Sequence, residues 1–259
     1  MILWHFPQKD LTLVKDSVHI WCTDLNLPTE LLTNLAGNLS LDERQRAERF
    51  YFEPDKKKFI ACRGLLRIIL SYYLNLAPDR LEFIYSLQGK PELNNKQLCF
   101  NVSHSQNLAV YAIALNRSVG IDLEYLRQIP NVQQLAERFF SPDESTMINS
   151  LDKEEQQEFF FRLWTIKEAY LKATGEGLAG LQKIAVSFTQ ENAVNLYQTQ
   201  HNILLNTHWF CAEFKPAPDY AGALVVQGED LAASAIAKRT MSNIEYFNLT
   251  TEYILNHWL

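Results

Sequence analysis

Two carboxylates that lie two residues apart have the type and spacing of side chains that bind a divalent cation. Asp122 and Glu124 belong to the segment Val119–Glu124, whose alternation is typical of a β-strand. On a strand, residues two apart point to the same face, so both carboxylates would lie side by side while Ile121 and Leu123 face the core. Two like charges this close raise one another's pKa unless a cation separates them, as Mg²⁺ would. An amphipathic strand with a solvated acidic face would show the same pattern, so this pair alone leaves both interpretations open.

A second group of charged residues follows on an expected helix. Trp164, Glu168 and Lys172 are spaced i, i+4 and i+8, which places them on one stripe. Glu168 could supply a third carboxylate to a metal, and Lys172 a positive charge one turn away. Lys167 lies about 100° round the helix from Glu168 and could flank the same site. The alternative is an ordinary surface Glu–Lys pair, although a tryptophan on the stripe indicates that this face is partly buried.

Residues upstream of the carboxylates have side chains that bind phosphate. Ser103 and His104 end an expected strand in a polar cluster and could donate hydrogen bonds to phosphate oxygens, with His104 helping as a cation. Lys90 lies on a tight Gly-Lys-Pro turn. Further basic residues could serve a nucleotide that carries several phosphates: Lys56, Lys57, Lys58, Arg63 and Arg67. Each of these residues could equally be a surface lysine or a structural histidine.

The elements that would position these side chains alternate between helices and strands. Helices are expected over 41–52, 56–74, 132–140, 142–151 and 153–173, and strands over 81–86, 98–103, 109–115, 119–124, 184–189, 209–214 and 221–226. Ser141 with Glu144 has the spacing of a capping box, and Gly175 and Gly177 end the last helix. This order favours an α+β fold in two halves, residues 1–117 and 118–259, over an alternating βαβ chain.

Composition narrows the class of protein. The 259 residues suffice for two domains of ordinary size, and the net charge of −6 argues against a dedicated nucleic-acid binder. No apolar run reaches the roughly 20 residues that a membrane span needs. The four cysteines form no C-x-x-C pair, which gives zinc or dithiol chemistry little support and favours a reduced, cytoplasmic protein. No phosphate-binding glycine loop of the common nucleotide folds is present.

Taken together, the motifs resemble the signature of the 4′-phosphopantetheinyl transferase superfamily. The resemblance lies in G-I-D-L-E at 120–124 and W-T-I-K-E-A-x-x-K-x-x-G at 164–175. N-V-S-H-S at 101–105, G-K-P at 89–91 and R-F-F-S-x-x-E at 138–144 match the larger, monomeric, Sfp-type branch. The resemblance extends from about Arg46 to Gly177 and more weakly to about Val226. Thr165 stands where the family often has serine or cysteine; it keeps a hydroxyl and a small volume, so we expect no loss of activity.

The resemblance implies a fold and a set of residue roles. The two similar α+β halves form an intramolecular pseudo-dimer with coenzyme A between them. The implied Mg²⁺ ligands are Asp122, Glu124 and Glu168, with Mn²⁺ as the other candidate metal. The implied catalytic residues near the phosphates are Glu168, Lys172 and Lys167. The implied coenzyme A contacts are Ser103 and His104 at the phosphates, Lys90 near the adenine end, and Lys58 or Arg63 at the 3′-phosphate.

The implied reaction is the transfer of 4′-phosphopantetheine from coenzyme A to a serine of an apo carrier protein, leaving 3′,5′-ADP. Acyl, polyketide and peptidyl carriers are all open as partners, and a monomer without nucleic-acid or membrane partners is expected. A docking surface for an acidic carrier is expected near residues 132–140. Two alternatives remain: another magnesium-dependent phosphotransferase, and a lapsed homologue that only binds coenzyme A or carrier proteins. The complete set of carboxylates and lysines argues against the second.

Overall fold

The computed structural model describes residues 4–7, 11–94, 98–205, 208–228 and 244–258. The first half contains β1 (Val18–Asp24), α1 (Thr29–Gly37), α2 (Leu41–Ala47), α3 (Glu53–Leu74), a short 3₁₀ turn (Pro78–Arg80), β2 (Phe83–Tyr85), β3 (Pro91–Leu93), β4 (Leu98–Ser105) and β5 (Leu108–Leu115). The second half contains β6 (Val119–Tyr125), α4 (Val132–Phe139), α5 (Pro142–Ser150), α6 (Lys153–Thr174), a 3₁₀ turn (Leu178–Lys183), β7 (Ile184–Phe188), β8 (Val194–Gln198), β9 (Ile203–Leu204), β10 (Trp209–Phe214) and β11 (Tyr220–Gln227). The α+β class expected from the sequence is confirmed.

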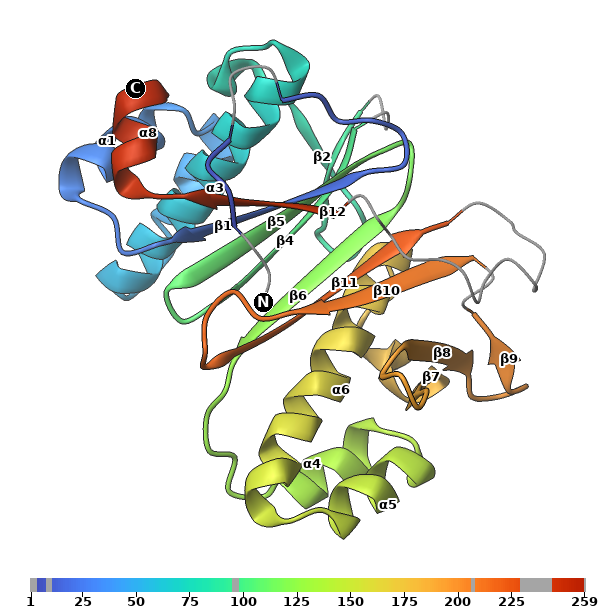
Figure 1. The fold of residues 1–259 in the computed structure, drawn as a ribbon. Helices are drawn as coiled ribbons and strands as arrows, with labels where there is room; N and C mark the ends of the chain where they lie inside the picture. Colours follow the sequence, from blue (N-terminus) through green and yellow to red (C-terminus); the bar gives the residue numbers. More distant parts are fainter. Residues whose placement is uncertain (1–3, 8–10, 95–97, 206–207, 229–243, 259) are drawn as a thin grey trace.

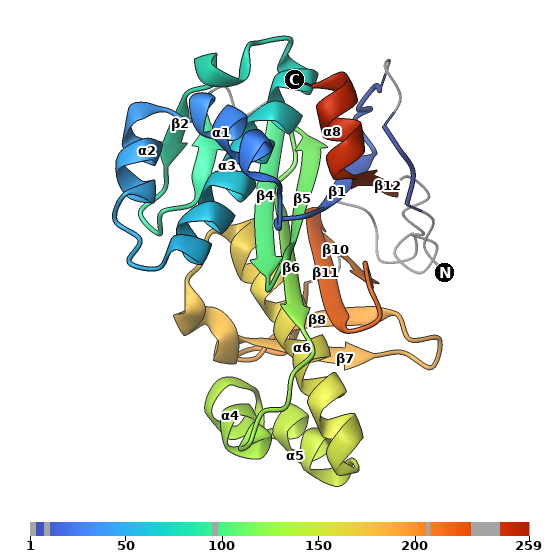
Figure 2. The ribbon, with the colours of Figure 1, turned by 90° about the vertical axis from the view of Figure 1, so that its left-hand side faces the viewer.

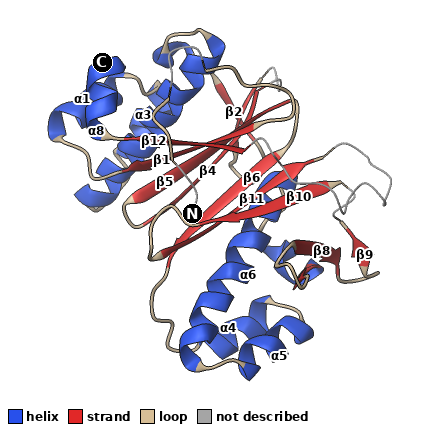
Figure 3. Cartoon of the chain, in the orientation of Figure 1, coloured by secondary structure: helices blue, strands red, loops and turns tan. Residues whose placement is uncertain are grey.

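The strands of two sheets occupy the middle of the molecule, and the helices cover its two ends (Figure 3). One sheet has the order β12-β1-β5-β4 and the other the order β10-β11-β6. Figures 1 and 2 show α1 and α3 against the first sheet and α6 against the second. A third apolar cluster contains residues of both sheets, among them Ile20, Val110, Ile121, Leu123 and Leu224. The core-facing side chains expected of β6 therefore join the two halves.

Side chains of β4 bind the backbone of β6 along the boundary between the halves. The Ile121 N–H donates to Asn101 Oδ1 at 2.9 Å, and the Leu123 N–H donates to Ser103 Oγ at 3.3 Å. Ser105 Oγ accepts from the Tyr125 N–H in the same way, at 3.0 Å. Because residues two apart on β4 point to one face, this polar edge follows the full length of β6. The motif that ends β4 therefore holds the strand that carries the carboxylates.

The ends of the long helices follow their sequence signals. Ser141 caps α5 in a capping box with Glu144, as expected, and Gly175 ends α6 at φ +79°. Pro54 lies in the first turn of α3, which starts before the expected position. The helix expected over 41–52 ends earlier, at Ala47. No helix in the described ranges combines the length and apolar character that crossing a bilayer requires.

The C-terminal segment corrects the expected division at residues 117 and 118. Strand β12 (Ile244–Leu249) pairs in parallel with β1, and α8 (Thr251–His257) follows it. Phe247, Leu249 and Ile254 are buried in the core of the first half. The end of the chain therefore belongs with the N-terminal sheet, because its apolar residues complete that core.

Candidate active site

A glycine brings the carboxylate strand against the long helix of the second half. A Cβ atom on Gly120 would lie 2.0 Å from the Ala169 backbone oxygen and 2.4 Å from the Ala173 nitrogen, so no larger residue fits between β6 and α6. This close approach places Asp122, two residues on, near Glu168 and Lys172 of the helix. The glycine of the G-I-D-L-E motif is thus required by packing.

Lys172 reaches across to β6 and binds Asp122. Its Nζ lies 2.6 Å from Asp122 Oδ1, 3.0 Å from Ser103 Oγ and 3.3 Å from the Ile121 carbonyl oxygen. The Ser103 hydroxyl in turn donates to Asp122 Oδ1 at 2.9 Å. Asp122, Lys172 and Ser103, singled out from the sequence, therefore form one polar cluster with contributions from both halves.

Glu168 completes this cluster with a perturbed carboxyl group. Its pKa is raised to about 7, chiefly by burial and also by the neighbouring Asp122 charge, while Lys172 opposes the shift. Glu168 Oε1 and Asp122 Oδ2 are both buried and have no hydrogen-bond partner among the described residues. Two buried carboxylate oxygens without partners suit a hard cation, since Mg²⁺ takes one or two carboxylates together with phosphate oxygens.

Glu124 lies beside these residues and has its own partners. Its Oε2 accepts from the Ser105 hydroxyl at 3.1 Å and lies 3.2 Å from Arg127 Nη1. Within the described part of the chain, no three His, Cys, Asp or Glu side chains are arranged to hold a metal ion. The set of three carboxylate ligands therefore stays a prediction, while Asp122 and Glu168 fit a cation by their unpaired oxygens.

The structure does not bring Lys167 to this cluster. Its side chain is completely buried, and Nζ donates to Glu144 Oε2 at 2.6 Å and to the Leu181 carbonyl oxygen at 3.2 Å. The ammonium also lies 4.7 Å from the centre of the Phe140 ring. Residues 167 and 168 leave the helix about 100° apart. Lys167 therefore points into the core of the second half and does not lie beside the carboxylates, where we expected it.

Lys90 lies at the boundary between the halves. Its Nζ donates to the Lys172 carbonyl oxygen at 2.6 Å and to the Val119 carbonyl oxygen at 3.4 Å. The last carbonyls of a helix lack partners within the helix, so a lysine there satisfies them. Lys90 therefore holds the turn between β2 and β3 close to the last turn of α6, and its ammonium is engaged with protein oxygens.

A basic cavity next to the cluster collects three of the residues expected to bind coenzyme A. Lys58, Arg63 and His104 line a cavity of about 380 Å³. Burial lowers the pKa of His104, and the charges of Lys172 and Lys58 lower it further. The lowered pKa disfavours the cationic form of the imidazole that we expected from the sequence. Because it responds to both lysines, His104 lies where the cavity adjoins the carboxylate cluster.

Arg46 also lines this cavity and was not singled out from the sequence. Its guanidinium lies 5.3 Å from the centre of the Phe59 ring, which lines the same space. Three arginines lie within or beside the short helix α2, and only their positions in space separate Arg46 from Arg44 and Arg49.

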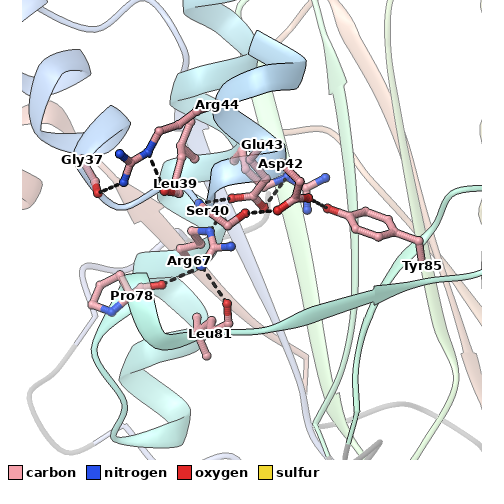
Figure 4. A network of polar contacts seen from close by, with 11 residues as sticks. Gly37, Leu39, Ser40, Asp42, Glu43, Arg44, Arg67, Pro78, Leu81 and Tyr85 are labelled. Carbon is pink, nitrogen blue, oxygen red and sulfur yellow. Dashed lines mark hydrogen bonds and ion pairs between the residues drawn. The ribbon is translucent and has the colours of Figure 1, made fainter.

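Of the residues that line this cavity, Arg63 is the best placed to bind an anion. Its side chain is about nine-tenths buried, and its Nη1 has no partner among the described residues. Nε lies 3.5 Å from Glu43, whose carboxylate is mainly bound by Arg67 at 2.6 Å. Figure 4 shows the network in which Arg67 also donates to the Pro78 and Leu81 carbonyl oxygens. Arg67 thus binds three oxygens inside the protein, and Arg63 keeps a donor for a ligand.

Comparison with known proteins relates the chain to one group of enzymes. A family model described as the 4′-phosphopantetheinyl transferase superfamily matches residues 118–225, and one described as 4′-phosphopantetheinyl transferase, N-terminal, matches residues 28–116. The 4′-phosphopantetheinyl transferase HetI of a Nostoc species is 42% identical over 229 residues, covering 87% of this chain and 94% of that protein. The 4′-phosphopantetheinyl transferase Sfp of Bacillus subtilis is 30% identical over 160 residues, covering 61% of this chain and 70% of that protein. A solved holo-(acyl-carrier-protein) synthase from Bacillus anthracis, in complex with CoA (3′,5′-ADP), is 23% identical with a TM-score of 0.36, covering 42% of this chain and 94% of that chain.

Proposed function

The chain belongs to the 4′-phosphopantetheinyl transferase superfamily, and from this membership we propose how its residues carry out the transfer. The enzyme moves 4′-phosphopantetheine from coenzyme A to a serine of an apo carrier protein and releases 3′,5′-ADP. The observation that carries the proposal is the juxtaposition of Asp122, Glu168 and Lys172 with a basic cavity of the other half.

The basic cavity suits the nucleotide end of coenzyme A. Arg63 has a free buried donor, and Lys58 and Arg46 add two positive charges around the same space. We assign the 3′-phosphate to Arg63 and Lys58 together, since a doubly charged group can use both. His104 and Ser103 follow on β4, where His104 can donate one hydrogen bond to the pyrophosphate and Ser103 can do so once its hydroxyl leaves Asp122. Lys90 acts through the end of α6, whose carbonyl it binds.

The reacting groups lie on β6 and α6. The serine oxygen forms a bond to the β-phosphorus of coenzyme A as the bond to the bridging oxygen breaks, and 3′,5′-ADP leaves. Glu168, whose pKa lies near 7, is suited to accept the serine proton. Lys172 stabilises the charge on the phosphoryl oxygens. Asp122, Glu124 and Glu168 would hold Mg²⁺ or Mn²⁺, which when bound supplies neutralisation of the pyrophosphate charge.

The partners follow from the family and remain part of the proposal. Acyl, polyketide and peptidyl carrier proteins are candidate substrates, and we expect a monomer because both halves of the site belong to one chain. We also place the enzyme in the cytoplasm, since all four cysteines are free thiols. The competing function is a lapsed protein that only binds coenzyme A or carriers.

Intact mass spectrometry separates these functions. Apo acyl, polyketide and peptidyl carriers are incubated with the protein, coenzyme A and Mg²⁺, with and without EDTA. A metal-dependent mass gain of one phosphopantetheine is expected for at least one carrier. Tight coenzyme A binding without any gain on all three would favour the lapsed protein.

A further inference from the structure

The ammonium of Lys172 already stands where a cation is needed. Three oxygen atoms surround it at 2.6–3.3 Å, from Asp122, Ser103 and the Ile121 carbonyl. An ammonium has three N–H donors, so these contacts satisfy it fully. Glu168, its neighbour one turn earlier on the helix, is left without this partner at Oε1.

The charges of the cluster show how the Lys172 ammonium affects the binding of a divalent ion. Three carboxylates, Asp122, Glu124 and Glu168, face two cations, because Lys172 binds Asp122 and Arg127 binds Glu124. The cluster therefore keeps at most one unbalanced negative charge. A divalent ion entering it would be repelled by a lysine only a few ångströms away.

A competing acceptor for Lys172 lies within reach of its flexible side chain. Ser103, which accepts from Lys172, and His104, which lines the basic cavity assigned to the nucleotide, leave opposite faces of β4, but the Lys172 charge still acts on the His104 imidazole, so the ammonium lies close to that cavity. A pyrophosphate placed there offers several charged oxygens to the ammonium. When Lys172 leaves Asp122, the charge of that carboxylate is no longer balanced, and the phosphates add further negative charge beside it.

We propose that Lys172 exchanges partners on binding: it holds Asp122 in the free enzyme and the pyrophosphate in the loaded enzyme, so that coenzyme A and the divalent ion bind cooperatively. This inference rests on the proposed function and concerns the regulation of the same site. Lys172 thereby keeps the free enzyme from taking up a divalent ion without its co-substrate.

Titration of the full-length protein with Mn²⁺, followed by the electron paramagnetic resonance signal of free Mn²⁺, tests the exchange without a carrier protein and without turnover. Wild type, Lys172→Met, Lys172→Gln and Lys172→Arg are titrated with and without coenzyme A. Without coenzyme A, the Met and Gln variants should bind Mn²⁺ about tenfold or more tightly than wild type, since one repulsive charge is gone. The Arg variant should stay weak, and coenzyme A should raise the wild-type affinity far more than that of the Met variant.

Thermal unfolding without Mn²⁺ identifies the variants that are folded, and the Gln variant replaces the Met variant if the latter is not. Folded neutral variants that bind Mn²⁺ no more tightly than wild type would overturn the exchange. The proposed metal residues are tested separately by adding Glu168→Gln to Lys172→Met. Loss of tight Mn²⁺ binding supports the assigned site, whereas unchanged binding places the ion elsewhere and overturns both the assignment and the exchange.

Discussion

The two long helices of the molecule stand in closely similar surroundings. Helices α3 and α6 have 22 residues each, and corresponding positions differ by 100 in number. Each follows a short helix with a serine capping box, Ser40 with Glu43 in the first half and Ser141 with Glu144 in the second. In both, the glutamate Oε2 accepts from the serine N–H, at 3.0 and 2.7 Å.

The same glutamate binds a buried cation on the long helix in each half. Arg67 Nε lies 2.6 Å from Glu43 Oε2, and Lys167 Nζ lies 2.6 Å from Glu144 Oε2. Each cation also donates to a leucine carbonyl oxygen, that of Leu81 or Leu181. Arg67 joins separate segments of the first half (Figure 4), and Lys167 is its counterpart in the second half.

The residues near these buried cations differ between the two helices, and the proposed catalytic groups are found on α6 alone. Glu168 and Lys172 of α6 correspond to Ile68 and Tyr72 of α3, whereas the cavity-lining Lys58 corresponds to Glu158. The first half thus carries the basic residues of the cavity, and the second half carries the carboxylates of the cluster. The same buried pair therefore supports both halves, while the residues beside it differ in the way that the proposed roles in nucleotide binding and catalysis require.

Breaking the buried pairs should have the largest effect on stability. Lys167→Met or Arg67→Met leaves a buried carboxylate without its cation, which should lower the free energy of unfolding in urea by about 3–5 kcal/mol in each half. The double variant Glu144→Gln with Lys167→Met should recover a large part of this loss, because no charge is left unpaired. A stable Lys167→Met protein would contradict the equivalence of the two pairs.

Gly120→Ala should separate the carboxylate strand from its helix. The added methyl would collide with the backbone of α6, so we expect a loss of about 3 kcal/mol of stability together with most of the transfer activity. Gly37→Ala is the matched control, since nothing lies within 4 Å of its Cβ position and its backbone is not left-handed. That variant should gain stability slightly, by about 0.5 kcal/mol, in the same urea titration.

The completely buried His19 makes the stability of the first half depend on pH. Burial lowers the pKa of His19 to about 4 from 6.5. The unfolded chain therefore binds a proton between pH 6.5 and 4 that the folded protein does not. Stability should be full above pH 6.5 and fall by about 3 kcal/mol as the pH drops to 4, at about 1.4 kcal/mol for each unit of the pKa difference.

A His19→Phe variant is the comparison for this pH series. Its unfolding free energy should change less than that of wild type between pH 6.5 and 4. Parallel curves for the two proteins would show that other groups cause the acid sensitivity.

The sequence was sufficient for the local features and insufficient for the long-range ones. Ser141, Glu144 and Gly175 marked helix ends through interactions with near neighbours, and the alternation of Ile121 to Glu124 marked β6. Strand β12 could not be assigned in advance, because its partner β1 is more than two hundred residues away in the chain. The burial of Lys167 depends on Glu144 and Leu181, which no helical spacing reveals.

The rate at which a Glu168→Gln variant transfers phosphopantetheine is the most direct test of whether catalysis belongs to α6. The rate of holo carrier formation would be measured by intact mass at saturating coenzyme A and Mg²⁺, with Glu158→Gln, an exposed carboxylate on the same helix, as the control. We expect Glu168→Gln to remain folded and to lose a factor of about 10² to 10⁴ in turnover, while the control keeps the wild-type rate. A folded Glu168→Gln enzyme with a near-normal rate would contradict the assignment of catalysis to α6.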